Sequence, residues 1–232
     1  MDRELEEYME GISSSEPDYL SRLLRDSYVE TINGHMNSGH LQGRLLKMLT
    51  AMIHPRRALE LGTFCGYSAC CIAEGLGEDA RLVTVEVDEE REEFILRHLA
   101  EAPCGGRIEL VIADCLEYMR GEADGSFDMI FMDADKRHYP EYLAEAARIL
   151  TPGGFLLADN TLWYGHVVES RRHDPQTLGI REFNRELAAM PGWDVVLLPL
   201  RDGLTLARKP RFQQNPEAPE CVDNIRTDKN RK

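Results

Sequence analysis

Two apolar stretches of this sequence are each followed directly by side chains with oxygen ligands. Asp133 follows the run 129–132, and Asp159 and Asn160 follow the run 155–158. Two carboxylates held close together repel each other unless a cation lies between them. Carboxylate and amide oxygens suit a hard divalent ion, Mg²⁺ or else Ca²⁺ or Mn²⁺, and the lack of histidine or cysteine at these positions argues against zinc. The pattern predicts a divalent metal site, with caps of helices and loops as the alternative.

A lysine, Lys136, stands three residues after the first of these aspartates. A dication beside its ammonium disfavours the charged form, so the neutral amine becomes available as a general base. The alternative for Lys136 is an ordinary solvated cation of a loop. His138 is a second candidate base, although it stands where a helix is expected to start. Asp135 is expected to be structural, as a cap for that helix.

The stretch 60-ELGTFCGYS-68 contains a glycine turn after the first apolar run. Gly62 and Gly66 are spaced G-x-x-x-G, which differs from the G-x-G-x-x-G that cradles a dinucleotide pyrophosphate. The open turn favours a nucleoside ligand without phosphates over NAD. An ordinary strand-to-helix turn has the same pattern and is the alternative.

Acidic residues also end the next two apolar runs. Glu86, in 82-LVTVEVD-88, is placed to bind two ribose hydroxyls. We interpret Asp88 as the N-cap of the following helix. Asp114 either accepts a hydrogen bond from the exocyclic amine of a base or caps the next helix, and both roles stay open.

An alternation of apolar runs and helix-like segments must position all these side chains. The runs are 58–61, 82–87, 108–112, 129–132 and 155–158, and the helix-like segments are 67–75, 89–102, 116–120 and 138–150. Such an alternation predicts a parallel sheet covered by helices on both faces, with right-handed crossovers. Ligands bind such sheets in the crevice at the carboxyl ends of the strands.

The two ends of the chain differ from this alternation. Runs at 194–200 and 204–208, joined by a three-residue link that contains glycine, predict a hairpin with an antiparallel last strand. Residues 1–54 read as extra N-terminal helices. The expected fold is therefore α/β and doubly wound, with a seven-stranded, mostly parallel sheet and a terminal antiparallel hairpin. We expect a single domain over 1–209, followed by a polar, proline-bearing mobile tail over 210–232.

The composition excludes several classes of protein. The formal net charge of −14 argues against nucleic acid as the main partner, because phosphate binding requires a basic face. A run of about 18 apolar residues, as a transmembrane helix needs, is missing, and the acidic start does not resemble a signal peptide. The six cysteines lack a CxxC pattern and are interpreted as reduced, buried thiols. We therefore expect a cytoplasmic protein without nucleic-acid or membrane partners.

The segments ELGTFCGYS, TVEVD, FMDADK and LADNTLWYGHVV, in this order and spacing, resemble the cation-dependent O-methyltransferases that use S-adenosylmethionine. That family includes animal catechol O-methyltransferase, plant caffeoyl-CoA O-methyltransferases and many bacterial relatives. The resemblance covers about 38–209 and implies the Rossmann-like fold of class I methyltransferases. Ala134 and Asp135 stand where the animal enzyme has His-Trp, so the chain is more similar to the plant and bacterial branch, which also implies a homodimer.

The resemblance implies a role for each matching residue. The divalent metal would be bound by Asp133, Asp159 and Asn160, and Lys136 would take the proton from the reacting hydroxyl. For S-adenosylmethionine, Glu86 would bind the ribose, Asp114 would lie at the adenine, and the methionine end and backbone would be held by Glu60, Gly62 and Ser68; Asp133 would also border this cofactor. Trp163 would form a wall of the aromatic substrate site, and Met36 and Ser38 would approach both cofactor and substrate. Asp202 lies near the place of the glutamate with which the animal enzyme orients its catechol, but it has no clear match there and is alternatively only part of the hairpin turn.

The resulting hypothesis is a metal-assisted methyl transfer from S-adenosylmethionine to a hydroxyl of a catechol-type or phenolic small molecule. A nucleotide-dependent oxidoreductase is one alternative, which the open glycine turn argues against. A non-catalytic S-adenosylmethionine-binding protein on the same fold is the other, which the intact Asp133, Lys136, Asp159 and Asn160 argue against.

Overall fold

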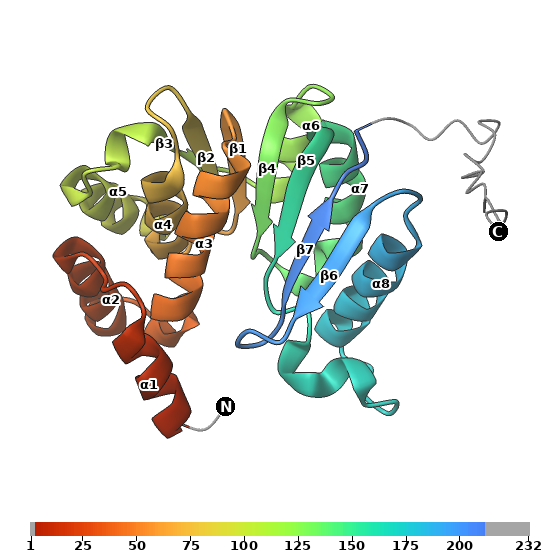
Figure 1. Ribbon diagram of the computed structural model, residues 1–232, viewed down its shortest axis with the longest axis horizontal. Coiled ribbons are helices and arrows are strands. Elements are labelled where there is room, and N and C mark those ends of the chain that lie inside the picture. Colours follow the sequence, from red (N-terminus) through yellow and green to blue (C-terminus); the bar gives the residue numbers. More distant parts are fainter. Residues whose placement is uncertain (1–2, 212–232) are drawn as a thin grey trace, which may run out of the picture.

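The computed structural model describes residues 3–211 of the 232-residue chain and contains a seven-stranded sheet with helices on both faces (Figure 1). The strands are β1 (Arg57–Leu61), β2 (Arg81–Glu86), β3 (Ile108–Ile112), β4 (Phe127–Met132), β5 (Leu150–Ala158), β6 (Asp194–Leu198) and β7 (Leu204–Arg208). Their order is β3-β2-β1-β4-β5-β7-β6. β1 to β5 are parallel, whereas β7 runs antiparallel to both β5 and β6. The predicted doubly wound fold with a terminal antiparallel hairpin is confirmed.

The helices alternate with the strands after an N-terminal helical segment. The α-helices are α1 (Arg3–Ile12), α2 (Asp18–Glu30), α3 (Gly39–Ile53), α4 (Tyr67–Gly75), α5 (Glu92–Glu101), α6 (Cys115–Gly121), α7 (Tyr139–Ile149) and α8 (Pro175–Ala189). Short 3-10 helices are η1 (Gly34–Met36), η2 (Glu89–Arg91), η3 (Gly105–Arg107), η4 (Lys136–His138) and η5 (Trp163–Val168). The first three α-helices correspond to the predicted N-terminal helices.

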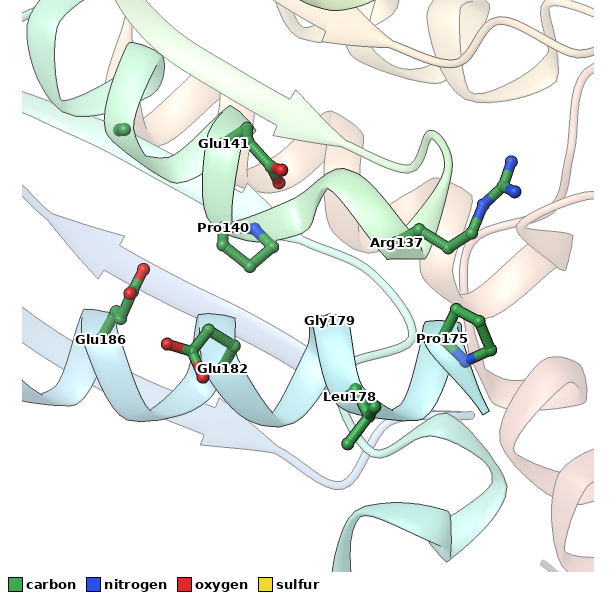
Figure 2. A pocket seen from close by; sticks show the side chains of 9 residues that line it. Arg137, Pro140, Glu141, Pro175, Leu178, Gly179, Glu182 and Glu186 are labelled. Carbon is green, nitrogen blue, oxygen red and sulfur yellow. The ribbon is translucent and has the colours of Figure 1, made fainter. Parts of the chain in front are cut away.

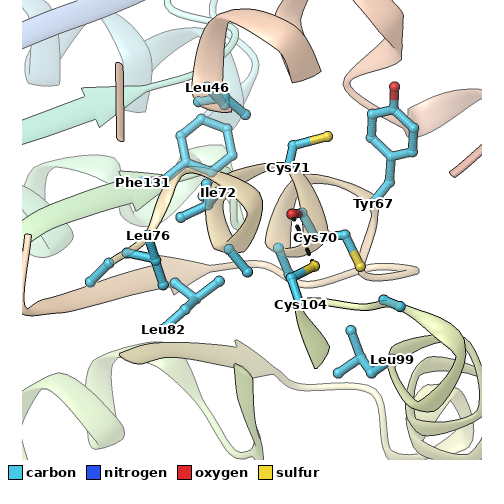
Figure 3. Close-up of a cluster of buried hydrophobic side chains, with 14 of the residues drawn as sticks. Leu46, Tyr67, Cys70, Cys71, Ile72, Leu76, Leu82, Leu99, Cys104 and Phe131 are labelled. Carbon is cyan, nitrogen blue, oxygen red and sulfur yellow. Dashed lines mark hydrogen bonds between the residues drawn. The ribbon is translucent and has the colours of Figure 1, made fainter. Parts of the chain in front are cut away.

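The central strands are buried on both faces, and alternate residues pack into two different cores. Met129 and Phe131 of β4 lie in the core formed with α2 to α5, whereas Ile130 and Met132 lie in the core formed with α6 to α8. Figure 3 shows part of the first core, where Phe131 lies near residues of α3 and α4. This two-sided burial explains why β4 is a continuous apolar run rather than an alternating one.

The structure differs from the sequence-based expectation at α8 and at β5. No element was expected over 166–193, yet α8 lies there. The Asp174 side chain caps this helix by accepting from the Thr177 N–H at 3.0 Å, and Ile180, Phe183 and Leu187 are buried at helical spacing. β5 starts five residues earlier than the run 155–158 suggested, because a register shift opposite β4 lets the strand continue through its glycines.

Both predicted caps are confirmed. The Asp88 carboxylate accepts from the Glu90 N–H at 3.1 Å, and the Asp135 carboxylate accepts from the Arg137 N–H at 3.0 Å. Asp135 caps η4, one turn before the helix at which it was expected.

The structure also bears on the expectations about membrane helices, cysteines and the C-terminal tail. Within 3–211, no helix is both long enough and apolar enough to cross a membrane. Cys65, Cys70, Cys71, Cys104 and Cys115 are buried and free of disulfides. Most of the predicted tail over 210–232 lies outside the described residues. The single domain over 1–209 stays a prediction.

Candidate active site

The carboxyl ends of β4 and β5 bring the two predicted aspartates together. These strands are parallel neighbours, and Met132 of β4 pairs in register with Ala158 of β5. Each aspartate follows directly: the Asp133 N–H donates to the Leu61 carbonyl at 2.9 Å, and the Asp159 N–H donates to the Met132 carbonyl at 3.0 Å. The hydrogen bonding of the sheet therefore extends to the backbone of both aspartates, which fixes the position of their carboxylates.

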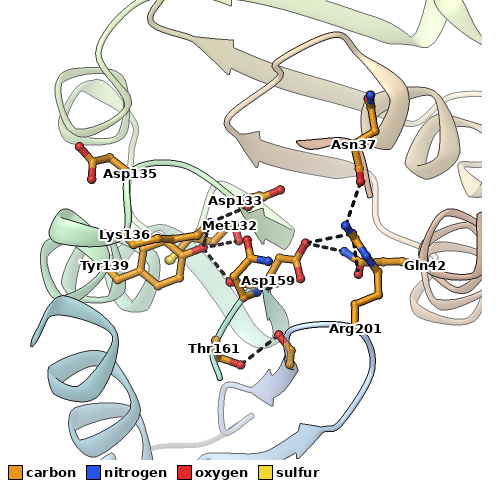
Figure 4. A network of polar contacts seen from close by, with 12 residues as sticks. Asn37, Gln42, Met132, Asp133, Asp135, Lys136, Tyr139, Asp159, Thr161 and Arg201 are labelled. Carbon is orange, nitrogen blue, oxygen red and sulfur yellow. Dashed lines mark hydrogen bonds and ion pairs between the residues drawn. The ribbon is translucent and has the colours of Figure 1, made fainter. Parts of the chain in front are cut away.

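Lys136 is buried beside the first of these carboxylates and is not a solvated loop cation. Its residue exposure is 7%, and its Nζ donates to Asp133 Oδ1 at 2.6 Å and to the Tyr139 hydroxyl at 2.8 Å (Figure 4). The side chain of His138, the other candidate base, is 47% exposed. Burial and hydrogen bonding thus favour Lys136 over His138 as a group of the site.

The position of Lys136 depends on Tyr139, whose side chain is fully buried. The Tyr139 hydroxyl lies 3.1 Å from the Met132 carbonyl and 3.0 Å from the Asp159 carbonyl, to which it donates. Burial keeps the pKa of Tyr139 well above its ordinary value, so the hydroxyl stays protonated. Tyr139 therefore joins the ends of β4 and β5 to the lysine, a role that sequence reasoning missed.

Asp159 is held by the N-terminal helices as well as by its own strand. Its Oδ2 accepts from Gln42 Nε2 of α3 at 2.7 Å, and its Oδ1 accepts from the Asn160 N–H at 2.8 Å. The guanidinium of Arg201, in the turn between β6 and β7, lies 3.9 Å from Asp159 Oδ2. Figure 4 shows Gln42 and Arg201 approaching this carboxylate from one side. Neither was predicted, because both are brought in from distant parts of the chain.

The charges at this edge of the sheet fit a hard divalent cation. Burial, together with the charge of the neighbouring Asp159, raises the pKa of Asp133 to about 6, although Lys136 opposes the shift. Within 3–211, no three His, Cys, Asp or Glu side chains gather closely enough to hold a metal ion by themselves. Asp133 and Asp159 would therefore need a neutral oxygen as a third ligand, and the amide of Asn160 follows immediately in the chain.

The glycine turn after β1 packs directly against the loop that carries Asp133. Gly62 has a φ of 92°, and a Cβ built on it would lie 2.5 Å from the Asp133 carbonyl oxygen. Only a residue without a side chain fits this approach. Gly66 also has a positive φ, but a Cβ there would meet only side-chain carbons at 3.5 and 3.7 Å. The predicted cofactor turn and the predicted metal loop are thus in contact.

Glu60 and Ser68 lie together at this turn. Glu60 is fully buried, and its Oε2 accepts from the Thr84 hydroxyl at 2.5 Å. Burial raises the pKa of Glu60 to about 8, although hydrogen bonds from Ser68 and Thr84 oppose the shift. The other carboxyl oxygen, Oε1, has no hydrogen-bond partner among the described residues. A buried acceptor without a partner is costly, which marks this oxygen as one that a donor from outside the described chain would stabilise.

The acidic residues at the carboxyl ends of β2 and β3 accept hydrogen bonds from backbone N–H groups of neighbouring segments. The Glu86 carboxylate accepts from the Phe64 N–H at 2.7 Å and from the Asp88 N–H at 3.0 Å. Asp114 caps α6, since its side chain accepts from the Glu117 N–H at 3.0 Å. The capping role left open for Asp114 is therefore present, and contact with a base stays a prediction.

The predicted substrate residues lie where the β6–β7 turn meets the loop after β5. The Asp202 carboxylate accepts from the Tyr164 N–H at 2.5 Å, next to Trp163, and the Leu162 N–H donates to the Asp202 carbonyl at 2.9 Å. Burial raises the pKa of Asp202. Asp202 therefore makes the hairpin turn and also anchors the loop that carries Trp163.

Met36 and Ser38 lie on the connection between α2 and α3. Met36 is 56% exposed, whereas Ser38 is buried. The residue between them, Asn37, connects this segment to the site, because its carbonyl accepts from Arg201 Nη2 at 3.0 Å. Direct contact of Met36 and Ser38 with a ligand stays a prediction.

A separate groove of about 720 Å³ lies between α7 and α8 (Figure 2). It is lined by Arg137, Pro140, Glu141, Ala144, Pro175, Leu178, Gly179, Glu182 and Glu186, and therefore by none of the predicted site residues. Its open, acidic lining lacks the convergent buried polar groups found at the ends of β4 and β5. The chemistry of the chain is therefore assigned to the strand ends and not to this groove.

Comparison with known proteins agrees with this geometry. The sequence model of the O-methyltransferase family matches residues 10–210. A catechol O-methyltransferase of Niastella koreensis is 33% identical over 174 residues, covering 72% of this chain and 79% of that protein. Caffeoyl-CoA O-methyltransferase 2 of Populus trichocarpa is 32% identical over 180 residues, covering 72% of each. The structure of an O-methyltransferase from Bacillus cereus in complex with SAH has a TM-score of 0.82 at 28% identity, covering 89% of this chain and 97% of that one. The chain belongs to the O-methyltransferase family.

Proposed function

We propose that this chain transfers the methyl group of S-adenosylmethionine to a hydroxyl of a catechol-type or phenolic small molecule, with a divalent cation held by Asp133, Asp159 and Asn160. The observation that carries the proposal is the burial of Lys136 against Asp133, with Asp159 on the adjacent strand. A buried base next to two carboxylates is an arrangement for moving a proton near a cation.

The relatives support both the donor and the substrate class. The Bacillus cereus neighbour was solved with SAH, and an O-methyltransferase of Streptomyces achromogenes, with a TM-score of 0.82 and 29% identity, was solved with SAM. The Niastella koreensis relative is named for catechol and the Populus trichocarpa relative for caffeoyl-CoA. We extend the donor and a phenolic acceptor from these proteins to this chain.

The residues around β1 and β2 suit the cofactor. The unpaired Oε1 of Glu60 can accept from the ammonium of a methionine end, and Gly62 holds the turn after β1 against the Asp133 carbonyl, where a side chain would not fit. Glu86 stands at the end of β2, where ribose hydroxyls are bound in sheets of this type. From β2 toward β4, the strand ends would thus hold first the ribose, then the methionine end at β1, and then the transferred methyl.

Lys136 is placed to take the proton of the reacting hydroxyl. Its Nζ donates one N–H to Asp133 and one to Tyr139, and it has no third hydrogen-bond partner among the described residues. The neutral amine can therefore direct its lone pair at a substrate hydroxyl. Bound S-adenosylmethionine supplies an activated methyl group, and a divalent cation supplies positive charge that favours loss of the proton. The chain itself contributes mainly positioning and charge placement.

The test is methylation of catechol by the purified protein with Mg²⁺ and with excess EDTA. We expect methylated product with Mg²⁺, its loss in EDTA and its return when Mg²⁺ is added in excess. Lys136→Met should lower kcat by about 10²- to 10⁴-fold, while S-adenosylhomocysteine still binds. Lys47→Met, which removes a half-exposed lysine of α3 that pairs with Glu74 away from the site, is the matched control and should retain activity.

Four outcomes would contradict parts of the proposal. Full activity in EDTA removes the metal role, and an active Lys136→Met removes the base assignment. Thermal stabilisation by NADH but not by S-adenosylhomocysteine would favour the oxidoreductase alternative. Binding of S-adenosylmethionine without turnover of any catechol or phenolic acid would favour a non-catalytic protein.

The proposal includes a homodimer and excludes nucleic acid and membrane as partners. Large apolar side chains are exposed on the N-terminal helices, among them Val29 and Ile32 near the end of α2 and Met52 in α3. Such exposure is typical of a surface that another protein covers. The net charge of −14 disfavours binding to phosphate groups. A cytoplasmic location stays a prediction.

A further inference from the structure

Arg201 has an unusual backbone for its residue type. It stands at the turn between β6 and β7 with a φ of 49°, in the left-handed region that non-glycine residues seldom occupy. Such a conformation is unfavourable and persists only where the surroundings enforce it. The conformation aims the side chain away from the hairpin and toward the ends of α3 and β5, where the candidate active site lies (Figure 4).

The guanidinium is held there by two uncharged oxygen acceptors and by one carboxylate at a long distance. Its Nη2 donates to the Asn37 carbonyl at 3.0 Å, its Nη1 lies 3.4 Å from Gln42 Oε1, and its distance to Asp159 Oδ2 is 3.9 Å, at the limit of an ion pair. Asp159 has closer partners in the Gln42 amide and the Asn160 N–H. The positive charge of Arg201 is therefore not neutralised by the Asp159 carboxylate in a close ion pair.

Arg201 is also the more accessible cation of the site. Its side chain is 34% exposed, whereas Lys136 is 8% exposed and in close contact with Asp133. A guanidinium carries five N–H donors in a planar fork that matches a carboxylate in two parallel hydrogen bonds. Among the described residues, the contacts of Arg201 leave part of that fork free, next to Asp202 and the loop that carries Trp163.

We propose that Arg201 is a specificity-determining residue that binds an anionic group, preferably a carboxylate, on the phenolic substrate. The inference rests on the proposed function and narrows its substrate class to catechols and phenols that bear a negative side group. The rival explanation is that Arg201 only ties the hairpin to the N-terminal helices. The two explanations differ in whether the negative charge of the substrate affects how well it binds and reacts.

The experiment compares substrates that share a catechol ring and differ in charge. The pairs are 3,4-dihydroxybenzoate with its amide, and 3-(3,4-dihydroxyphenyl)propanoate with its amide. In the wild-type protein we expect kcat/KM to be roughly 10-fold or more higher for the acid in at least one pair, mainly through KM, because hydrogen bonds to a charged group discriminate strongly. Arg201→Met should bring this ratio near one by weakening the acid alone.

Two further variants separate recognition from folding. Arg201→Gly removes the side chain and suits the positive φ, so it should fold at least as well as the wild type and lose the same preference. Arg185→Met removes one exposed arginine from α8 and should leave the ratio unchanged. The proposal is overturned if the wild type prefers neither acid, or if Arg201→Met and Arg201→Gly weaken acid and amide equally, as a purely structural tie predicts.

Failure of the proposed function would look different. In that case the wild type methylates none of the four compounds. The same four compounds are then titrated calorimetrically into protein saturated with S-adenosylhomocysteine. Tighter binding of an acid than of its amide, lost in Arg201→Met, supports the role of Arg201 without turnover, and equal binding refutes it.

Discussion

At the scale of single residues, the half-buried carboxyl group of Asp133 and the fully buried one of Glu60 are compensated differently. Asp133 has a cation, Lys136, within 2.6 Å. Glu60 has only hydroxyl donors, Thr84 and Ser68, and one of its oxygens lacks a partner among the described residues. A buried carboxyl without a cation is more stable neutral, and burial accordingly raises the pKa of Glu60 to about 8 from 4.5.

Glu60 should therefore make the stability of the cofactor-free protein fall with rising pH. Between pH 4.5 and about 8 the folded state retains a proton that the unfolded state has lost, so the free energy of unfolding decreases across this window. Its contribution is complete below pH 4.5 and lost above the folded-state pKa. Glu60→Gln cannot ionise, and relative to it the wild type should lose roughly 4 kcal/mol from pH 4.5 to 8.

The measurement is urea unfolding at several pH values across this window. Only the slope with pH is compared, so any constant cost of placing an amide at this position cancels. Glu109→Gln, on the exposed side of β3, is the matched control and should follow the wild type. A pH dependence that is the same in Glu60→Gln and in the wild type would show that Glu60 is ionised in the folded protein.

At the scale of secondary-structure elements, the site depends on loops that touch at the strand ends. The turn after β1 contacts the loop after β4 at Gly62, and α8 contacts η4 at Gly179, where a Cβ would lie 2.3 Å from the Lys136 carbonyl oxygen. Close packing at both glycines fixes the loop that carries Asp133 and Lys136. The orientation of the candidate base is thus set by backbone contacts on two sides.

Gly62→Ala and Gly66→Ala form a matched pair for this contact. Both positions have a positive φ, so both variants should lose about 1–2 kcal/mol of stability from the left-handed conformation. Gly62→Ala adds a clash with the Asp133 carbonyl and should lose a further 1–3 kcal/mol, together with affinity for S-adenosylhomocysteine. Chemical denaturation and calorimetric titration give both values. Equal losses in the two variants would mean that the loops do not depend on this contact.

At the scale of the whole molecule, the N-terminal helices join the active site to an exposed apolar surface. Gln42 of α3 holds Asp159, while Met48 and Met52 of the same helix are exposed one turn apart. Near the end of α2, Val29 and Ile32 are exposed as well. A second copy of the chain that covered this surface would also stabilise the helix that positions Asp159.

We expect the wild type to have twice the 26.4 kDa chain mass in light scattering after gel filtration. The double variant Val29→Glu/Ile32→Glu should dissociate to monomers, because a desolvated charge in an apolar interface is strongly unfavourable. Val168→Glu, on the exposed η5, is the control and should remain dimeric. A monomeric wild type, or a double variant with unchanged mass, would place the interface elsewhere or exclude it.

Much of the fold could be predicted because hydrophobic patterning is a local property. Runs such as 129–132 appear apolar on every residue since β4 is buried on both faces, and the positions of Asp133 and Asp159 follow from where such runs stop. α8 carries a recognisable cap at Asp174 and a helical apolar spacing, so the sequence does contain a signal for this helix. The early start of β5 had no clear signal, because glycines usually end strands.

The sequence by itself determined the kind of chemistry: the order of the strands' acidic ends, the glycine turn and the lysine after Asp133. Only the tertiary structure decided which groups surround that lysine and Asp159. Tyr139, Gln42 and Arg201 reach the site from a helix start, the N-terminal helices and the last hairpin, and the ion contact between Arg201 and Asp159 spans 42 positions of the chain. Patterns of neighbouring residues carry no information about such pairings, because they depend on how the sheet brings distant turns to one edge and on which donors then meet a buried carboxylate.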